Sequence, residues 1–245
     1  QGTLIGHLLE CGGQITGGYF ADPGRKNVED LANLGFPYAV IEPNGQATIT
    51  KLAGTGGTVS LQTVKEQLLY EIHDPENYYT PDCIANFSTA KLEETGKDQV
   101  LVYGASGKRK PDTFKVSVGY HAGFLGEGEI SYAGSSSLQR GELAEQILQA
   151  RLSHHYPQLK TDLIGVSSLH HGQFGNDRSY EVRVRAAALC KSKRAAETIG
   201  HEVEALYTNG PAAGGGARAK VQEVVGIVST FINREEIAVN TQIWE

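Results

Sequence analysis

A chain of 245 residues with a formal net charge of −6 is long enough to bury one substantial hydrophobic core or two modest ones. The acidic balance argues against a nucleic-acid-binding protein, because such proteins carry a basic face that displaces counterions from phosphates. No apolar run reaches the length of a bilayer span and no signal peptide is apparent, so we expect a cytoplasmic protein without a membrane segment.

Cysteine usage and the start of the chain set two further expectations. Cys11, Cys83 and Cys190 lie far apart with no C-x-x-C pair, which predicts neither a disulfide framework nor a thiolate zinc site. We predict no metal site elsewhere. The chain begins at Gln1 and contains no methionine, so we expect a processed or partial form of a longer protein.

The first predicted element is a helix over residues 3–10, which ends at the glycines 12 and 13. His7, Glu10 and Cys11 stand three and four apart, so they share one side of this helix. Two interpretations remain open. The three residues form an acid–base or nucleophile cluster facing a cleft, or they are a buried thiol beside a solvated pair.

Residues 14–30 read as a loop, and residues 28–34 can add a short helix. A hairpin follows, because residues 38–42 and 46–50 alternate around Asn44 and Gly45, the strongest short-range hairpin signal. This hairpin leads into the glycine-rich stretch that we expect to organise the site.

Glycines at 54, 56 and 57 precede a helix predicted to extend to Ile72, with Ser60 or Thr58 as its cap. The free N–H groups of its first turn could hold a carboxylate, phosphate or oxyanion. A tight turn into a packed helix is the alternative, since neither nucleotide-binding glycine motif is present. The predicted substrate-binding residues here are Gly54, Thr55, Gly56, Gly57, Thr58 and Lys65.

Residues 84–133 are predicted to be rich in β-strands. Before them, Asp74 either orients His73 as a base or starts a turn, and we favour the turn. Glu127 and Glu129 lie two apart in a glycine-rich strand and project to one face, where repulsion would raise one pKa; they could also flank a metal, and we assign them to substrate binding. The alternative is a β-bulge with exposed glutamates.

A helix is predicted over residues 136–155, opened by a capping box at Ser136, with Leu143, Ile147 and Arg151 along one stripe. The strand predicted over residues 162–167 delivers His170 to its C-terminal end, where α/β proteins tend to keep ligands. His170 is therefore an acid–base candidate.

The last part of the sequence predicts a β-α-β-β unit. Its parts are a strand from 181, a helix over 192–207 and strands over 221–231 and 237–244. The loop 208–218 either wraps an anion with help from Arg218 or is a connector. The fold class is mixed α/β: a β-rich centre with hairpins, flanking helices and this C-terminal unit. Regions 1–135 and 136–245 are expected to pack as one continuous domain.

Several blocks carry a family resemblance. They include His7-Leu-Leu-Glu-Cys-Gly-Gly and the Gly54 stretch, and they cover residues 7–20, 33–38, 50–59, 63–72, 74–82, 115–120, 126–134, 163–166 and 202–211. Over nearly its whole length the chain resembles the acyclic terpene utilisation AtuA family. Family members extend further toward the N-terminus, so the resemblance implies that this chain is the later half of the family's core domain, as a fragment or as a subunit of a split protein.

The resemblance implies a role in the catabolism of acyclic terpenoids of the citronellol and geraniol type, which are degraded as branched acyl-CoA thioesters. It carries no catalytic assignment. Our leading hypothesis is an enzyme with hydratase, lyase or hydrolase chemistry on a branched acyl-CoA or carboxylic acid, with CoA as part of the substrate. His7, Glu10, Cys11 and His170 are the catalytic candidates. The alternative is a non-catalytic scaffold subunit, and either form is expected to be a homo- or hetero-oligomer.

Overall fold

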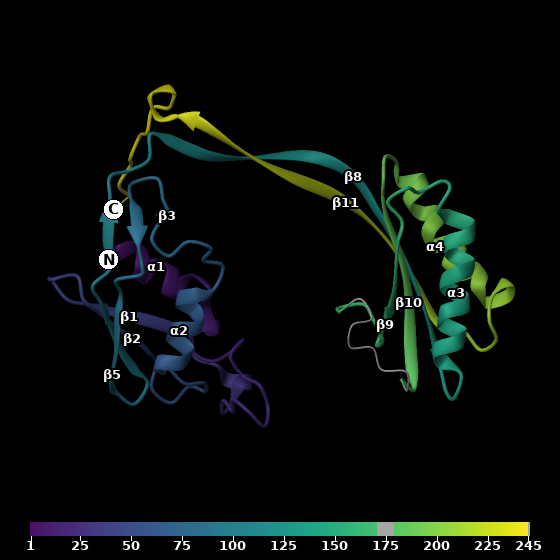
Figure 1. Ribbon diagram of the computed structural model, residues 1–245, viewed down its shortest axis with the longest axis horizontal. Coiled ribbons are helices and arrows are strands. Elements are labelled where there is room, and N and C mark those ends of the chain that lie inside the picture. Colours follow the sequence, from purple (N-terminus) through teal and green to yellow (C-terminus); the bar gives the residue numbers. More distant parts are fainter. Residues whose placement is uncertain (171–178, 245) are drawn as a thin grey trace. The chain divides into compact units, whose positions relative to one another are not determined.

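The computed structural model describes residues 1–170 and 179–244 (Figure 1). The chain divides into two compact units. The first unit comprises Gln1–Val116 and Phe231–Glu245, and the second comprises Ser117–Thr230. The sequence-based boundary after residue 135 therefore falls inside the second unit, and the packing of the two regions as one domain stays a prediction.

The first unit combines two α-helices with two small antiparallel sheets, ordered β1-β2-β6-β5 and β3-β4-β7. Its core is an apolar cluster between the helices and the larger sheet, with Leu4, Leu8, Ile49 and Val64 fully buried. The elements are α1 (Gly2–Glu10), η1 (Gly12–Gln14), η2 (Leu31–Asn33), β1 (Pro37–Ile41), β2 (Ala47–Lys51), α2 (Leu61–Leu69), β3 (Tyr78–Tyr79), β4 (Ile84–Asn86), β5 (Lys91–Gly96), β6 (Gln99–Tyr103), β7 (Ser106–Lys108) and η3 (Arg234–Glu236).

The local signals of the first unit predicted its elements well. The β1–β2 hairpin forms around Asn44 and Gly45 as expected, with Gly45 at φ +83°. Ser60 caps α2 by accepting from the Thr63 N–H, and the Thr63 hydroxyl accepts from the Ser60 N–H in return. Asp74 starts the turn that we favoured, because its carboxylate accepts from the Glu76 N–H.

Three expectations for this unit are corrected. Helix α2 ends at Leu69, before the predicted end at Ile72. The segment 28–34 forms only the single 3-10 turn η2. Residues 237–244 form no strand in the described structure, although they alternate in the sequence, so the predicted β-α-β-β tail is β-α-β. Alternation alone does not make a strand when no neighbour supplies hydrogen bonds.

The second unit has the order β-α-β-β-α-β and one antiparallel sheet with strand order β11-β8-β10-β9. This is the ferredoxin-like topology. Together with the first unit it confirms the mixed α/β fold class. The elements are β8 (Thr113–Ala133), α3 (Ser137–Leu152), β9 (Lys160–Ile164), β10 (Glu181–Cys190), α4 (Lys193–Asn209) and β11 (Gly215–Asn233).

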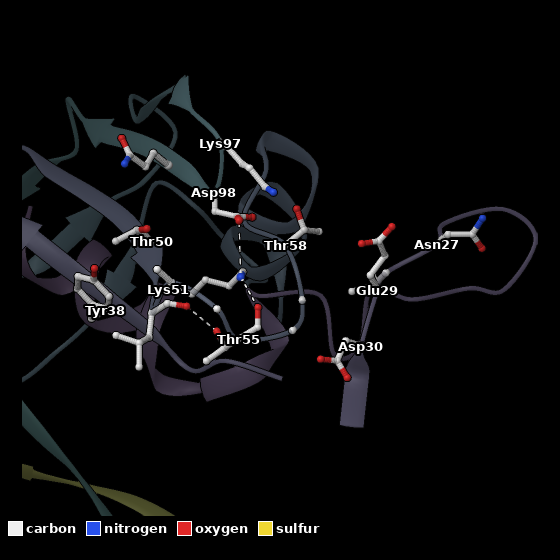
Figure 2. Close-up of a pocket in the computed structure, with 17 residues that line it drawn as sticks. Asn27, Glu29, Asp30, Tyr38, Thr50, Lys51, Thr55, Thr58, Lys97 and Asp98 are labelled. Atoms are coloured by element: carbon white, nitrogen blue, oxygen red, sulfur yellow. Dashed lines mark hydrogen bonds and ion pairs between the residues drawn. The ribbon is translucent and has the colours of Figure 1, made fainter. Parts of the chain in front are cut away.

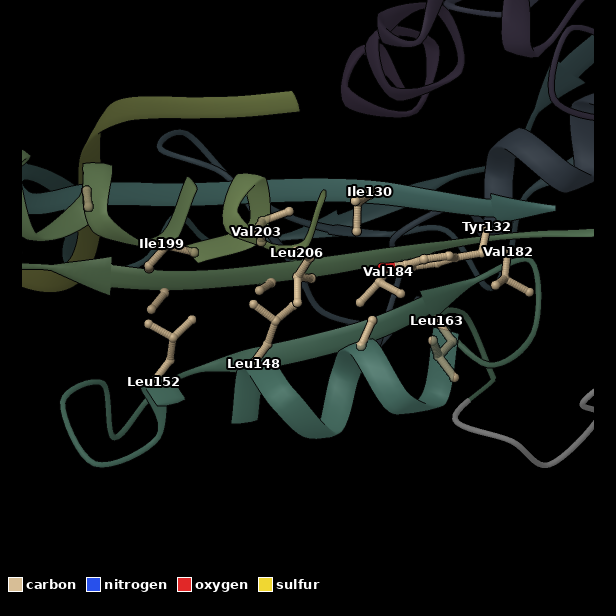
Figure 3. Packing of buried hydrophobic residues seen from close by; sticks show 14 of the residues in the cluster. Ile130, Tyr132, Leu148, Leu152, Leu163, Val182, Val184, Ile199, Val203 and Leu206 are labelled. Atoms are coloured by element: carbon tan, nitrogen blue, oxygen red, sulfur yellow. The ribbon is translucent and has the colours of Figure 1, made fainter. Parts of the chain in front are cut away.

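Helices α3 and α4 cover the same face of this sheet. Figure 3 shows Leu148 of α3 and Leu206 of α4 pointing toward Val184 of β10, and all three are fully buried. The buried stripe of α3 runs through Ser137, Gly141, Ala144, Leu148 and Leu152, so the predicted stripe through Leu143, Ile147 and Arg151 is wrong. Ser136 makes no side-chain capping bond, so the predicted capping box is absent as well.

Two glycines of β8 let α4 approach the sheet closely. A Cβ atom on Gly126 would lie 2.2 Å from the carbonyl oxygen of Ala196 in α4. A Cβ atom on Gly128 would lie 2.7 Å from the Val203 side chain. The glycine-rich stretch is therefore a regular strand under a helix and not a bulge.

Candidate functional site

Backbone hydrogen bonds lock the glycine-rich Gly54 loop to two distant segments of the first unit. The N–H groups of Gly56, Gly57 and Thr58 each donate to a carbonyl of these segments at 2.9 Å. The acceptors are the carbonyls of Asn33, Glu29 and Thr16, in that order. The turn after α1, the η2 region and the Gly54 loop are thus held together by main-chain contacts.

Glycine is required at these contacts for steric reasons. A Cβ atom on Gly56 would lie 1.9 Å from the carbonyl oxygen of Asp30, and one on Gly35 would lie 2.0 Å from the Thr55 hydroxyl oxygen. Gly57 additionally has φ +85°, a conformation that side chains with a Cβ rarely adopt. The glycines therefore allow close backbone approach.

The Gly54 loop forms one wall of a pocket with a volume of about 810 Å³, hereafter the Gly54 pocket (Figure 2). The other walls come from residues 27–30, from the end of β2 and from the turn between β5 and β6. The charged side chains that line it are Glu29, Asp30, Lys51, Lys97 and Asp98. Its size lies in the range of about 300–1,000 Å³ that is usual for small-molecule sites.

Lys51 is the most unusual residue of this pocket, because its side chain is only 6% exposed. Its Nζ donates to the Thr55 carbonyl at 2.8 Å and lies 3.6 Å from Oδ2 of Asp98, as the dashed lines in Figure 2 show. Asp98 has φ +55° and accepts the Val59 N–H through Oδ1 at 2.9 Å. A buried ammonium group is retained where a carboxylate and hydrogen-bond acceptors compensate its desolvation.

The amides of residues 56–59 are not available to hold an anion, whereas anion binding by the first turn of α2 stays a prediction. The N–H groups of residues 56–59 already donate within the protein, and the Thr63 N–H in the first turn of α2 donates to Ser60. An anionic guest would therefore meet the ammonium groups of Lys51 and Lys97 and the Thr58 hydroxyl. Gly54 to Thr58 all line the pocket, whereas Lys65 is exposed on α2 and does not.

The His7 side chain is buried and connects two helices. Nδ1 lies 2.7 Å from Oε1 of Glu10, and Nε2 lies 3.3 Å from the carbonyl oxygen of Leu68 in α2. The ring stacks on Phe87 with centroids 5.6 Å apart. Because both ring nitrogens face oxygen acceptors, His7 positions Glu10, whose side chain is 52% exposed and is the open member of the pair.

One tyrosine, Tyr78, lies beside this pair. The Tyr78 ring lies 5.8 Å from the His7 ring, and burial raises the pKa of Tyr78, with the charges of Glu10 and Glu71 adding to the effect. Cys11 is half-buried at the end of α1. None of His7, Glu10 and Cys11 lines the Gly54 pocket, although their helix leads directly into the turn that bonds to the Gly54 loop.

Glu127 and Glu129 lie in the second unit and are paired with arginines. Arg185 Nε donates to Glu127 at 2.9 Å, and Arg183 Nη1 lies 3.3 Å from Glu129. The alternative of a β-bulge with exposed glutamates is therefore wrong, because both carboxylates are largely buried in a regularly paired strand. Burial alone would lower the pKa of Arg185, but Glu127 and then Asp162 hold its charge, and the pKa is raised. A role for Glu127 and Glu129 in substrate binding stays a prediction.

His170 is exposed in the turns that follow β9, and His171 and Gly172 lie outside the described residues. The reason for choosing His170 does not apply, because β9 pairs antiparallel with β10 and the ligand-site rule concerns parallel sheets. Its catalytic role stays a prediction. Among residues 1–170 and 179–244, no three His, Cys, Asp or Glu side chains are grouped as metal ligands would be.

Lys51 and Asp98 are the residues that sequence reasoning missed. Each had a weak signal, since Lys51 directly precedes the glycine stretch and Asp98 ends a hairpin turn. Their proximity depends on how β2, β6 and the Gly54 loop assemble. No pattern within one segment reports that assembly.

The fold and the pocket define a mixed α/β protein with a polar pocket in one unit and a ferredoxin-like second unit. The family model described as "Acyclic terpene utilisation family protein AtuA" matches residues 1–243. The chain therefore belongs to this family, and membership supports a role in acyclic terpene utilisation. Neither the curated proteins nor the solved structures gave a match. No helix in the described parts of the chain is long and apolar enough to cross a membrane.

Proposed function

We propose that this protein is a cytoplasmic enzyme that acts on a branched terpenoid acid or its acyl-CoA thioester, by hydratase, lyase or hydrolase chemistry, in the Gly54 pocket. The family role in acyclic terpene utilisation supports the substrate class. The observation that carries the site is Lys51, a buried ammonium group in the wall of a pocket large enough for a small-molecule substrate.

Hydration, lyase and hydrolase reactions of thioesters all build negative charge on the carbonyl oxygen, as an enolate or a tetrahedral oxyanion. A preorganised cation next to that oxygen lowers the barrier, because it needs no reorganisation during the reaction. In this proposal Lys51 has that role and Asp98 holds its ammonium group in place. CoA enters only as part of the substrate.

Proton transfer needs an acid or base within reach of the substrate, and the carboxylates of Glu29 and Asp30 line the pocket. The sequence-based candidates Glu10 and His7 remain hypotheses for the same step, as does Cys11 as a nucleophile. Parallel Glu29→Gln and Glu10→Gln variants separate the two locations. Loss of turnover in the first variant alone would assign the step to the Gly54 pocket.

The decisive test is turnover of geranyl-CoA and of its free acid by the purified full chain, with products followed by mass spectrometry. Lys51→Met is expected to lower kcat/KM at least tenfold, about 1.4 kcal/mol of transition-state stabilisation. Lys91→Met is the matched control, since Lys91 is an exposed lysine on β5 outside the pocket. Equal rates for Lys51→Met and the wild type would remove the pocket from the mechanism.

A second candidate, a scaffold subunit without catalysis, is favoured by one feature of the second unit. Strand β11 is an edge strand and exposes Val225 and Ile227 by 67% and 64%. Exposed apolar strands at a sheet edge are sites of pairing with another chain. Size-exclusion chromatography with mass measurement tests this, because a monomer that binds and turns over substrate would contradict the scaffold role.

A further inference from the structure

A second, apolar pocket of about 450 Å³ lies in the first unit, hereafter the Phe231 pocket. It shares no lining residue with the Gly54 pocket. Its walls are mainly aromatic and proline side chains, from Tyr79, Pro81, Pro111, Phe114 and Phe231. Such a lining offers a hydrocarbon chain dispersion contacts and shelter from water.

Arg234 fixes the walls of the Phe231 pocket. Its guanidinium group lies over the Phe114 ring at 4.0 Å, donates to the Pro111 carbonyl at 3.1 Å and also donates to the Pro81 carbonyl. The Arg234 N–H donates to the Asp112 carbonyl at 3.1 Å. One arginine thus connects the segments on either side of the pocket, so the pocket does not depend on a ligand to bring its walls together.

Lys115 supplies the one formal charge among the described residues that line this pocket. Lys115 and Thr113 lie two apart in β8, so their side chains project to the same face of the strand. The lysine is exposed and belongs to the lining of the pocket, so its ammonium group is hydrated. This combination suits a ligand with an anionic head and an aliphatic tail.

We propose that the Phe231 pocket binds an aliphatic carboxylate, with the tail between the aromatic and proline walls and the carboxylate at Lys115. The size of the pocket and its single cation favour a medium-length monocarboxylate over a nucleotide, which needs several polar partners. The site goes beyond the proposed reaction, because binding here requires neither CoA nor turnover in the Gly54 pocket. It gives the protein a second ligand site for the free acid.

Isothermal titration calorimetry of the full chain with hexanoate, octanoate and decanoate tests whether the aliphatic tail of the ligand contributes to binding. Each added methylene is expected to tighten binding about fourfold as long as the chain fits. Decanol, which lacks the anionic head, is expected to bind at least tenfold more weakly than decanoate. Affinity that is independent of chain length would overturn the proposal.

Variants test the location of the ligand. Lys115→Met is expected to weaken decanoate at least tenfold and to leave decanol unchanged, whereas Lys110→Met, an exposed lysine outside the lining, changes neither. Phe231→Ala is expected to reduce the gain per methylene, and this side chain is 70% exposed, so the variant should fold. Unchanged decanoate affinity in both the Lys115→Met and the Phe231→Ala variants would overturn the site.

Lys51→Met separates this inference from the proposed function. If it lowers turnover of geranyl-CoA and leaves decanoate binding intact, the two pockets are separate sites as proposed. If it abolishes decanoate binding while Lys115→Met has no effect, the carboxylate binds in the Gly54 pocket and the inference is wrong. Intact decanoate binding in a chain that turns over no thioester would support the Phe231 pocket and count against the enzyme.

Discussion

The second unit and the surroundings of the Gly54 pocket in the first unit are held together by different kinds of contact. In the second unit, α3 and α4 cover one face of a regular antiparallel sheet, and alternating strand residues meet helical stripes in a single apolar cluster. Around the Gly54 pocket, backbone approaches backbone directly, at glycines whose Cβ atoms would overlap carbonyl oxygens. Packed side chains tolerate graded changes in volume, whereas main-chain contacts tolerate almost none. Main-chain contacts thus hold the Gly54 loop in place beside the apolar core of the first unit.

The strongest test of this difference is Gly56→Ala. The added Cβ atom would lie 1.9 Å from the Asp30 carbonyl oxygen, so two backbone segments must separate. We expect a loss of about 4 kcal/mol in the free energy of unfolding, near the upper end for single substitutions. Chemical denaturation measures it. Gly107→Ala is the control, since its nearest atom lies 3.6 Å away, and equal losses in the two variants would refute the steric argument.

Leu148→Ala tests the side-chain packing of the second unit. Leu148 is fully buried between α3 and the sheet, and its truncation should cost about 3 kcal/mol through lost burial and the cavity left behind. Leu143→Ala on the same helix should cost less than about 0.5 kcal/mol, because this side chain is 47% exposed. If the Leu143 variant were the less stable of the two, the predicted stripe would be right and the observed one wrong.

Lys51→Met should have a smaller effect on folding than either core change. The substitution leaves the Asp98 carboxylate without its cation, but this side chain is 18% exposed and keeps its bond to the Val59 N–H. We expect a loss of about 2 kcal/mol, below the usual cost of breaking a fully buried pair. The Asp98→Asn substitution should lower the free energy of unfolding less in the Lys51→Met variant than in the wild type. Strict additivity of the two changes would show that the residues are not coupled.

The smallest effect concerns pH. The Asn77 side chain and the Glu76 N–H lower the pKa of Asp74 by donating to its carboxylate. A lowered pKa in the folded state stabilises the protein at pH values above the ordinary carboxyl pKa. This contribution is lost as the pH falls through the pKa of the folded state. Asn77→Ala should therefore raise the pKa of Asp74 and weaken the protein slightly at neutral pH.

An NMR titration of the Asp74 carboxyl measures this shift. Lys108→Ala is the matched control, because Lys108 donates to Asn77 but the bond from Asn77 to Asp74 remains. A pKa that moves as far in the Lys108 variant as in the Asn77 variant would mean that charge and not the hydrogen bond sets it.

Two signals contained within a few residues predicted the structure well, whereas a third, the capping box expected at Ser136, does not form. The Asn44-Gly45 turn and the Ser60 cap need only their immediate neighbours, and both form as expected. The predicted stripe of α3 failed except at Ile147, which packs against the core, because Gly141 and Ala144 form much of the buried side and small residues carry little apolar signal in a sequence. The strand expected over 237–244 failed because strands need a partner that the sequence does not specify.

The site was predicted in outline only. The Gly54 loop lines a pocket as its glycines suggested, since their role is local. Lys51 and Asp98 were not found, because they meet only through the assembly of β2, β6 and the loop. The arginine partners of Glu127 and Glu129 depend on the register of β8 against β10. In the backbone register Glu129 lies opposite Arg185 and Glu127 lies opposite Ala187, so the ion pairs of Arg185 with Glu127 and of Arg183 with Glu129 run diagonally across the two strands. Neither relation leaves a trace in the spacing of residues along the chain.

The glycines of β8 have a practical consequence for anyone who alters this protein. Where α4 packs on Gly126 and Gly128, only hydrogen atoms fit between helix and strand. A Cβ atom at either position would therefore push the helix away from the strand. The opposite side of the same strand carries Glu127 and Glu129. Labels or affinity tags should therefore not be attached at Gly126 or Gly128, because neither position has space for a side chain.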